Sequence, residues 1–119
     1  MTQLHTTSHA MQECIDNCKE CHAICVATTV HCLEMGGKHA QAAHIRTLLD
    51  CAQICATSAD FMLRSSPFHA QTCGVCADVC EACATECERM AGNDEQMRRC
   101  ADMCRRCAAS CRSMASMAA

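Results

Sequence analysis

Apolar side chains recur every three or four residues along most of this chain, and polar side chains fill the positions between them. An α-helix advances about 3.6 residues per turn, so positions three and four apart lie on one helical face. In the segment CGVCADVCEACATEC, residues 73–87, the recurring residue is cysteine, at successive steps of three, four, three and four. This spacing predicts an amphipathic helix whose inward face is a stripe of thiols.

Three further segments carry cysteine in the same register, and no segment shows the strict alternation expected of a β-strand. Each stripe occupies the positions at which a bundle helix usually places its apolar seam. The stripes account for all sixteen cysteines, which are Cys14, Cys18, Cys21, Cys25 and Cys32; Cys51 and Cys55; Cys73, Cys76, Cys80, Cys83 and Cys87; and Cys100, Cys104, Cys107 and Cys111.

Residues that commonly end or begin helices interrupt the pattern at three places, which are Gly36-Gly37, Ser66-Pro67 and Gly92-Asn93. We expect Ser66 to cap the third helix, with Pro67 at its first helical position. We expect Asn93 to cap the fourth helix, with Gln96 as its capping-box partner.

These breaks predict four helices, over residues 8–35, 38–64, 68–91 and 94–115. The links between them are only a few residues long, which favours antiparallel neighbours. The predicted fold is all-α: an antiparallel up-down-up-down four-helix bundle with a cysteine-lined core, formed by residues 1–119 as a single domain.

Composition makes cysteine the main material of the core. Leu, Ile, Val and Phe together number fifteen, and Trp and Tyr are absent, so these residues cannot fill a conventional core. The net charge is −3, with acidic and basic residues interspersed, so no basic face for nucleic acid is expected. The opening segment MTQLHTTSHAMQEC lacks the apolar run of a secretory signal, and no run approaches membrane-spanning length. We therefore expect a cytoplasmic protein without a membrane partner, in a compartment that keeps thiols reduced.

An isolated core cysteine usually serves as a small hydrophobe. Sixteen cysteines on facing stripes need another explanation. Small side chains leave voids in a core, and each methyl-sized void lowers the stability of the fold by about 1 kcal/mol. Disulfides within one helix are disfavoured, since Cβ atoms three or four residues apart are separated by about 5–6 Å and a disulfide needs about 3.8 Å. Bridges between helices remain possible, although a reducing compartment works against them.

Metal binding fits the pattern better. Two thiolates that hold a two-coordinate ion need sulfurs about 4.6 Å apart, which neighbouring or facing cysteines can reach by small rotamer changes. Thiolate and thioether ligands select Cu(I). Zinc prefers separate four-ligand sites, usually on turns, and iron–sulfur clusters need a wrapping loop, whereas the CxxC pairs here lie within helices. We interpret the stripes as sites for many Cu(I) ions, with zinc or iron–sulfur binding as the alternatives.

A thiol redox protein is a further alternative with little support. His22 follows Cys21, but consecutive residues on a helix point about 100° apart, so this pair does not form a nucleophile and its base. Nothing singles out one cysteine among sixteen as a reactive thiol. We do not expect an enzyme.

Soft, neutral ligands continue the stripes at both ends of the predicted bundle, where they could pass Cu(I) inward. At the end containing Gly36 and Gly92, the candidate metal-entrance or auxiliary ligands are Met35, His44, Met90 and Met97. At the opposite end, the corresponding side chains are Met11, Met62, His69 and Met114. The glycine-containing links favour the first end as the entrance.

The motifs CIDNCKECHAIC, CAQIC, CGVCADVCEACATEC and CADMCRRCAASC, on four successive helices, resemble the bacterial copper storage proteins, and in particular their cytosolic branch. The resemblance runs from Cys14 to Cys111. It implies a four-helix bundle whose inward cysteines bind many Cu(I) ions for storage and buffering, and a protein that assembles as a homotetramer. We expect copper ions as its ligands and a copper donor or acceptor as its partner. A second apolar stripe off the cysteine seam agrees with a subunit interface, and it consists of Val26, Val30, Leu33, Leu49 and Leu63.

Overall fold

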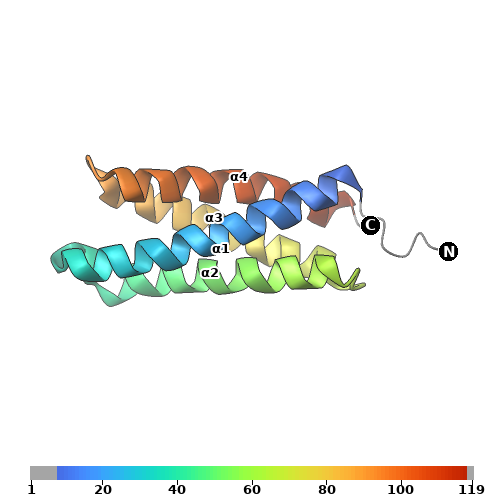
Figure 1. Ribbon diagram of the computed structural model, residues 1–119, viewed down its shortest axis with the longest axis horizontal. Coiled ribbons are helices and arrows are strands. Elements are labelled where there is room, and N and C mark those ends of the chain that lie inside the picture. Colours follow the sequence, from blue (N-terminus) through green and yellow to red (C-terminus); the bar gives the residue numbers. More distant parts are fainter. Residues whose placement is uncertain (1–7, 118–119) are drawn as a thin grey trace.

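The computed structural model describes residues 8–117 of the chain and consists there of helices without any strand (Figure 1). The four long helices form an elongated bundle of 54 × 21 × 20 Å. Their bounds are α1 His9–Met35, α2 Ala42–Leu63, α3 His69–Ala91 and α4 Glu95–Met117, with a short 3-10 helix η2, Gly37–Ala40, before α2. The predicted all-α four-helix bundle is confirmed.

Each helix packs against its neighbours in chain order, and α4 closes the ring against α1. In Figure 1 the α1–α2 and α3–α4 links lie together at the left. We call this the glycine end, because it contains Gly36 and Gly92. The α2–α3 link, the start of α1 and the end of α4 lie together at the right, and we call this the terminal end.

The first link is longer than predicted, so α2 begins at Ala42 rather than at residue 38. Gly36 and Gly37 both adopt positive φ values, 71° and 58°, which favour glycine and stop α1 as expected. Residues 37–40 then form the 3-10 turn, and Gln41 is extended at ψ 144°, which separates that turn from α2.

The predicted cap of α3 is wrong in detail. The Oγ atom of Ser66 accepts the backbone N–H of Phe68 at 3.1 Å, and α3 begins only at His69. Pro67 therefore lies in the turn before the helix and not at its first helical position.

The cap of α4 is Asp94 and not Asn93, since Asp94 Oδ1 accepts the backbone N–H of Met97 at 2.9 Å. Asp94 also binds the His31 ring of α1 at 2.7 Å, and this tertiary contact favours it over its neighbour. Gln96 closes no capping box, because its Nε2 donates to Thr28 Oγ1 of α1 at 2.9 Å.

The core contains all sixteen cysteine side chains, each 0 % exposed. The largest fully buried apolar side chains around them are Ile15, Leu48, Met62 and Met97. Among residues 8–117 no Asp, Glu, Lys or Arg side chain is buried, so the interior holds thiols and a few neutral polar groups. Within this range, no helix combines the length and hydropathy needed to cross a membrane.

Candidate metal centre

The thiols form a continuous column along the bundle axis. Neighbouring Sγ atoms on different helices lie 3.5–4.0 Å apart, and these contacts run without a break from Cys14 at the terminal end to Cys100 near the start of α4. From the terminal end inward, one unbroken path runs Cys14–Cys111 (3.6 Å), Cys111–Cys18 (3.5 Å), Cys18–Cys107 (3.7 Å), Cys107–Cys55 (3.9 Å), Cys55–Cys80 (3.5 Å), Cys80–Cys51 (3.7 Å), Cys51–Cys104 (3.9 Å), Cys104–Cys25 (3.8 Å) and Cys25–Cys100 (3.8 Å).

The column is narrow enough for diagonal contacts between α2 and α4. Cys51 lies 3.9 Å from Cys104, and Cys55 lies 3.9 Å from Cys107. A sulfur in the middle of the bundle therefore has thiol neighbours on several helices, so one metal ion can draw its ligands from more than one helix.

The spacing of the sulfurs suits metal ions rather than disulfides. All sixteen cysteines are free thiols, and the shortest of the Sγ–Sγ contacts above is 3.5 Å, far longer than a disulfide bond of about 2.05 Å. Three thiolates around one ion at about 2.3 Å each would place their sulfurs about 4.0 Å apart, close to the observed separations. A two-coordinate ion needs its two sulfurs about 4.6 Å apart, so the two Sγ atoms of a contact would have to move only slightly apart.

The same thiols also form quartets whose four Sγ atoms all lie within 4.8 Å of one another. Three of these quartets share no member: Cys18, Cys76, Cys107 and Cys111; Cys21, Cys51, Cys55 and Cys80; and Cys25, Cys83, Cys100 and Cys104. Each could hold a tetrahedral ion. None leaves room for an inorganic iron–sulfur core between sulfurs that are already this close.

Hydrogen bonds between thiols lower the pKa of some cysteines and raise that of others, whereas burial raises the pKa throughout. The S–H groups of Cys107 and Cys111 stabilise a thiolate at Cys18 and lower its pKa to about 6. Burial raises the pKa of Cys32, at the glycine end, to about 11, and the Asp94 carboxylate adds to this effect. A thiolate in the column needs S–H donors beside it, so only a minority of the thiols can ionise together without a metal.

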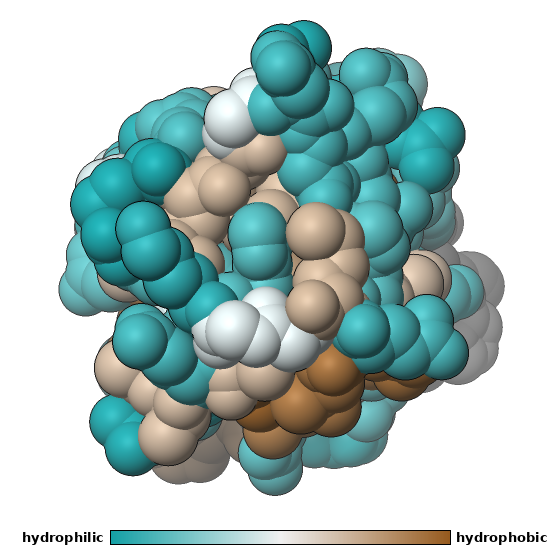
Figure 2. Space-filling view, turned by 90° about the vertical axis from the view of Figure 1, so that its left-hand side faces the viewer, coloured by the Kyte–Doolittle hydropathy of each residue, from teal (hydrophilic) through white to brown (hydrophobic). Residues whose placement is uncertain are grey.

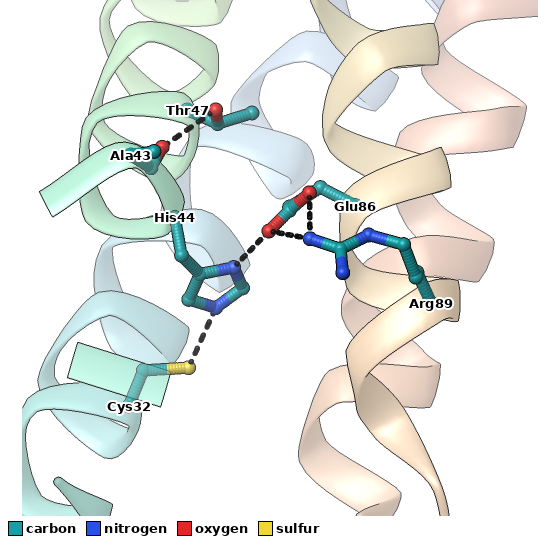
Figure 3. A network of polar contacts seen from close by, with 6 residues as sticks. All are labelled: Cys32, Ala43, His44, Thr47, Glu86 and Arg89. Atoms are coloured by element: carbon teal, nitrogen blue, oxygen red, sulfur yellow. Dashed lines mark hydrogen bonds and ion pairs between the residues drawn. The ribbon is translucent and has the colours of Figure 1, made fainter. Parts of the chain in front are cut away.

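A buried histidine lies at the glycine end of the column (Figure 3). The His44 side chain is 1 % exposed; its Nε2 lies 3.3 Å from Cys32 Sγ and its Nδ1 lies 3.2 Å from Glu86 Oε2. Arg89 Nη2 donates to both Glu86 oxygens at 2.8 Å and lowers the pKa of that carboxyl. The ionised Glu86 accepts Nδ1–H, and this contact directs the Nε2 atom of His44 at Cys32.

This site was compared with those of known proteins. The family described as copper storage protein, Csp, matches residues 7–116. The chain belongs to this family. It is 39 % identical over 67 residues to the uncharacterized cysteine-rich protein YhjQ of Bacillus subtilis, and the matched stretch covers 56 % of this chain and 62 % of YhjQ.

Solved structures of similar proteins cover nearly the whole bundle. The Nmul_A1745 protein of Nitrosospira multiformis is 46 % identical, with a TM-score of 0.87 over 93 % of this chain and 99 % of that chain. The Cu(I)-bound copper storage protein BsCsp3, from Bacillus subtilis, is 38 % identical, with a TM-score of 0.83 over 90 % and 99 %. A cytosolic copper storage protein from Streptomyces lividans, solved with five coppers, is 32 % identical, with a TM-score of 0.78 over 90 % and 92 %.

The structure of this copper storage family member places the candidate entrance residues unequally. His44 and Met97 are buried against the column, and Met90 is partly buried and packs on the core. Met35 is 50 % exposed on the surface of α1, so it does not continue the thiol seam as its spacing suggested. The glycine end is largely hydrophilic at its rim, and less hydrophilic side chains gather toward its centre (Figure 2).

Several residues of this end were not found from the sequence. Neither Glu86 nor Arg89 was predicted to take part in the site, yet Glu86 binds His44 and Arg89 binds Glu86. His39 has a buried Nε2 without a hydrogen-bond partner among residues 8–117, and its ring lies 6.4 Å from that of His44. The His44–Glu86 and His39–His44 contacts join separate helices and turns, so no local spacing signals them; only the Glu86–Arg89 pair, three residues apart on α3, is local.

His22 plays no part in a thiol–imidazole pair within the described range. Its Nδ1 donates to the carbonyl oxygen of Ala52 at 2.8 Å and so joins α1 to α2. The expectation that His22 points away from Cys21 is consistent with this contact.

Proposed function

We propose that this protein stores and buffers Cu(I) in its thiol column, at about one ion per cysteine. The observation that carries the proposal is the uninterrupted path of sulfurs 3.5–4.0 Å apart in a core without buried charged side chains among residues 8–117. Cu(I) accepts two or three thiolate ligands and shares sulfurs between ions, so it can fill such a path along its whole length.

Charge balance favours Cu(I) over zinc. Sixteen thiolates and sixteen Cu(I) ions cancel, whereas one zinc ion with four thiolates leaves two uncompensated negative charges. Uncompensated charge in an apolar interior is costly, and within residues 8–117 no buried Lys or Arg is present to offset it. The three separate quartets make zinc the second candidate, with a capacity of three ions rather than about sixteen.

An anaerobic titration of the reduced protein with Cu(I), against a competing chromophoric chelator, tests the proposal. Binding should continue to about sixteen ions per chain, while circular dichroism shows unchanged helicity because the apo bundle is already folded. Cys104→Ser and Cys14→Ser should each lower the capacity by about one ion, since bridging sulfurs let metals and thiols match in number. Saturation at one to four ions would contradict storage, and saturation with three zinc ions of equal affinity would favour the zinc alternative.

The glycine end is the proposed entrance, with His44, Met90 and Met97 as its ligands and Met35 at its outer surface. The Cys32–His44 pair supports this. A Cu(I) ion held linearly between a sulfur and a nitrogen needs these two atoms about 4.3 Å apart. Cys32 Sγ and His44 Nε2 lie 3.3 Å apart, so a small outward movement of either side chain would admit the ion. His44→Phe removes the ligand nitrogen and should slow loading from a Cu(I)–chelator complex several-fold. Met103→Leu, on α4 away from both ends, is the control; equal rates for the two variants would exclude His44 from the path.

Assembly is proposed as a homotetramer, with the apolar stripe of α1 and α2 as one contact surface. Val26, Val30, Leu33, Leu49 and Leu63 are 43–55 % exposed, and the most hydrophobic colour in Figure 2 lies over the α1–α2 half of the glycine end. Light scattering of the wild type and of Val30→Asp should give a tetramer and a smaller species, respectively. The proposed location is the cytoplasm, and the proposed role is storage without enzymatic turnover, with a copper donor or acceptor as the transient partner.

A further inference from the structure

The path of thiol–thiol hydrogen bonds stops short of the buried histidine at the glycine end. The last such contact in that direction joins Cys25 to Cys100, at 3.8 Å. Cys32, which continues the same stripe of α1, contacts His44 instead, and within residues 8–117 it hydrogen-bonds to no other thiol (Figure 3). Cys32 and His44, which we call the outer pair, are therefore set apart from the thiol column.

Two buried residues fill the gap on the side formed by α1 and α2. The outer pair joins these helices at one level of the bundle, and the Cys21–Cys51 contact, at 4.0 Å, joins them at another. On α2 the two levels are seven residues apart, about 10 Å along the helix axis. Thr28 on α1 and Leu48 on α2 occupy inward positions between these levels, and both side chains are 0 % exposed.

Neither side chain is a suitable ligand for Cu(I). The hydroxyl oxygen of Thr28 is a hard ligand, and it already accepts the Nε2–H of Gln96 at 2.9 Å. Leu48 has no ligand atom at all. When the cysteine stripes are extended by steps of three and four residues, from Met11 on α1 to Met114 on α4, every other position carries sulfur, nitrogen or oxygen. Leu48 thus places hydrocarbon where the pattern elsewhere places a polar or soft atom.

We propose that Leu48, together with Thr28, is a non-ligating barrier that slows the exchange of Cu(I) between the outer pair and the thiol column; the inference rests on the proposed function. Cu(I) moves through a protein by exchanging one soft ligand for the next. On the α1–α2 side of the barrier an ion finds no such ligand for about 10 Å, so only the α3–α4 side, with Cys83 and Cys100, offers a route. The barrier slows loading and release alike, and it thereby retains ions that have reached the column.

Two substitutions of similar volume at one position test the barrier. Leu48→Met adds a thioether sulfur and Leu48→Ile adds no ligand, and both keep the core filled. Loading from a Cu(I)–chelator complex and release into an excess of chelator are followed by the absorbance of the chelator. Leu48→Met should load and release several-fold faster than the wild type, and Leu48→Ile should match the wild type. Equal rates for the two variants would overturn the barrier. Unfolding temperatures of the apo variants identify any loss of folding.

A matched control adds a sulfur elsewhere in the core. Ser58 is fully buried on α2, and its Oγ lies 3.4 Å from Cys73 Sγ, on the far side of the column from the outer pair. Leu48→Cys and Ser58→Cys should each raise the capacity by about one ion, whereas only Leu48→Cys should speed exchange. Faster exchange in Ser58→Cys as well would refute a barrier at Leu48, because an added sulfur would then act wherever it lies.

Capacity and rate separate this inference from the proposed function. A wild-type protein that saturates at only a few ions would refute storage, whatever the variants do. A wild-type capacity of about one ion per cysteine, with equal exchange rates in Leu48→Met and Leu48→Ile, would refute the barrier and leave storage intact.

Discussion

Replacing Glu86 tests whether the buried His44 depends on its carboxylate. His44 is 1 % exposed, and its Nδ1–H donates to Glu86 at 3.2 Å. Glu86→Ala leaves this donor without its partner, which costs about 1–3 kcal/mol. For a chain of 119 residues the entropy of unfolding is about 0.25 kcal/mol per degree, so the unfolding temperature of the apo protein should fall by about 4–12 °C.

The assay is thermal unfolding of reduced apo protein, followed by circular dichroism at 222 nm. Glu86→Gln keeps an acceptor oxygen, so its unfolding temperature should fall clearly less than that of the alanine variant. Glu88→Ala is the control for lost charge: Glu88 lies on α3 like Glu86, and its exposed ion pair with Arg105 of α4 should contribute little to the unfolding temperature. Nitrogen NMR should show the His44 proton leaving Nδ1 in Glu86→Ala. The reasoning is refuted if Glu86→Ala unfolds within 1–2 °C of Glu88→Ala, or if glutamine and alanine at position 86 behave alike.

Three further predictions concern protons, the helix cap and the core. Because burial raises the pKa of Cys32 to about 11, Cu(I) must displace its proton; a pH indicator in weak buffer should register proton release on loading, and Cu(I) affinity should fall as the pH falls. Burial opposes ionisation of Asp94, but the His31 ring and the Met97 N–H together lower its pKa, so its stabilising effect is present above about pH 4 and is lost as the pH falls through the lowered value. Asp94→Ala should cost about 0.5–2 kcal/mol at pH 7 and should lessen the fall in urea midpoint in acid; an unchanged acid profile would contradict this assignment. Leu48→Ala should destabilise the apo protein by about 2–5 kcal/mol, and loading with Cu(I) should raise the unfolding temperatures of the wild type and the variant alike, because metal bound only by the folded state stabilises it; a loaded variant that unfolds at its apo temperature would argue against that coupling.

The helices and their chemistry could be predicted because both depend on local spacing. Steps of three and four residues fix which side chains share a helical face, whatever the helix packs against. All sixteen cysteines are buried as their spacing indicated, and the glycines at positions 36 and 92 end their helices as expected. The soft, neutral character of the interior follows from residue type alone, so residue type is enough to favour Cu(I) as the bound ion.

The caps show where local prediction loses its power. Asn93 and Asp94 are adjacent and both suit an N-cap, and the capping-box spacing from Asn93 to Gln96 favoured the wrong one of the two. Asp94 is selected by His31, which lies 63 positions earlier on α1. Gln96 is likewise drawn to Thr28 of α1 instead of to its own helix end.

The sequence by itself determined four amphipathic helices, an inward stripe of thiols on each, and the preference for a soft monovalent ion. Only the tertiary structure decided which sulfurs meet across the core, that Glu86 and Arg89 orient His44, and that Met35 lies outside the seam. The physical reason is that helical periodicity sets the direction of each side chain around its own axis. The rotation and sliding of one helix against another depend on packing among all four, and those two quantities decide every contact between helices.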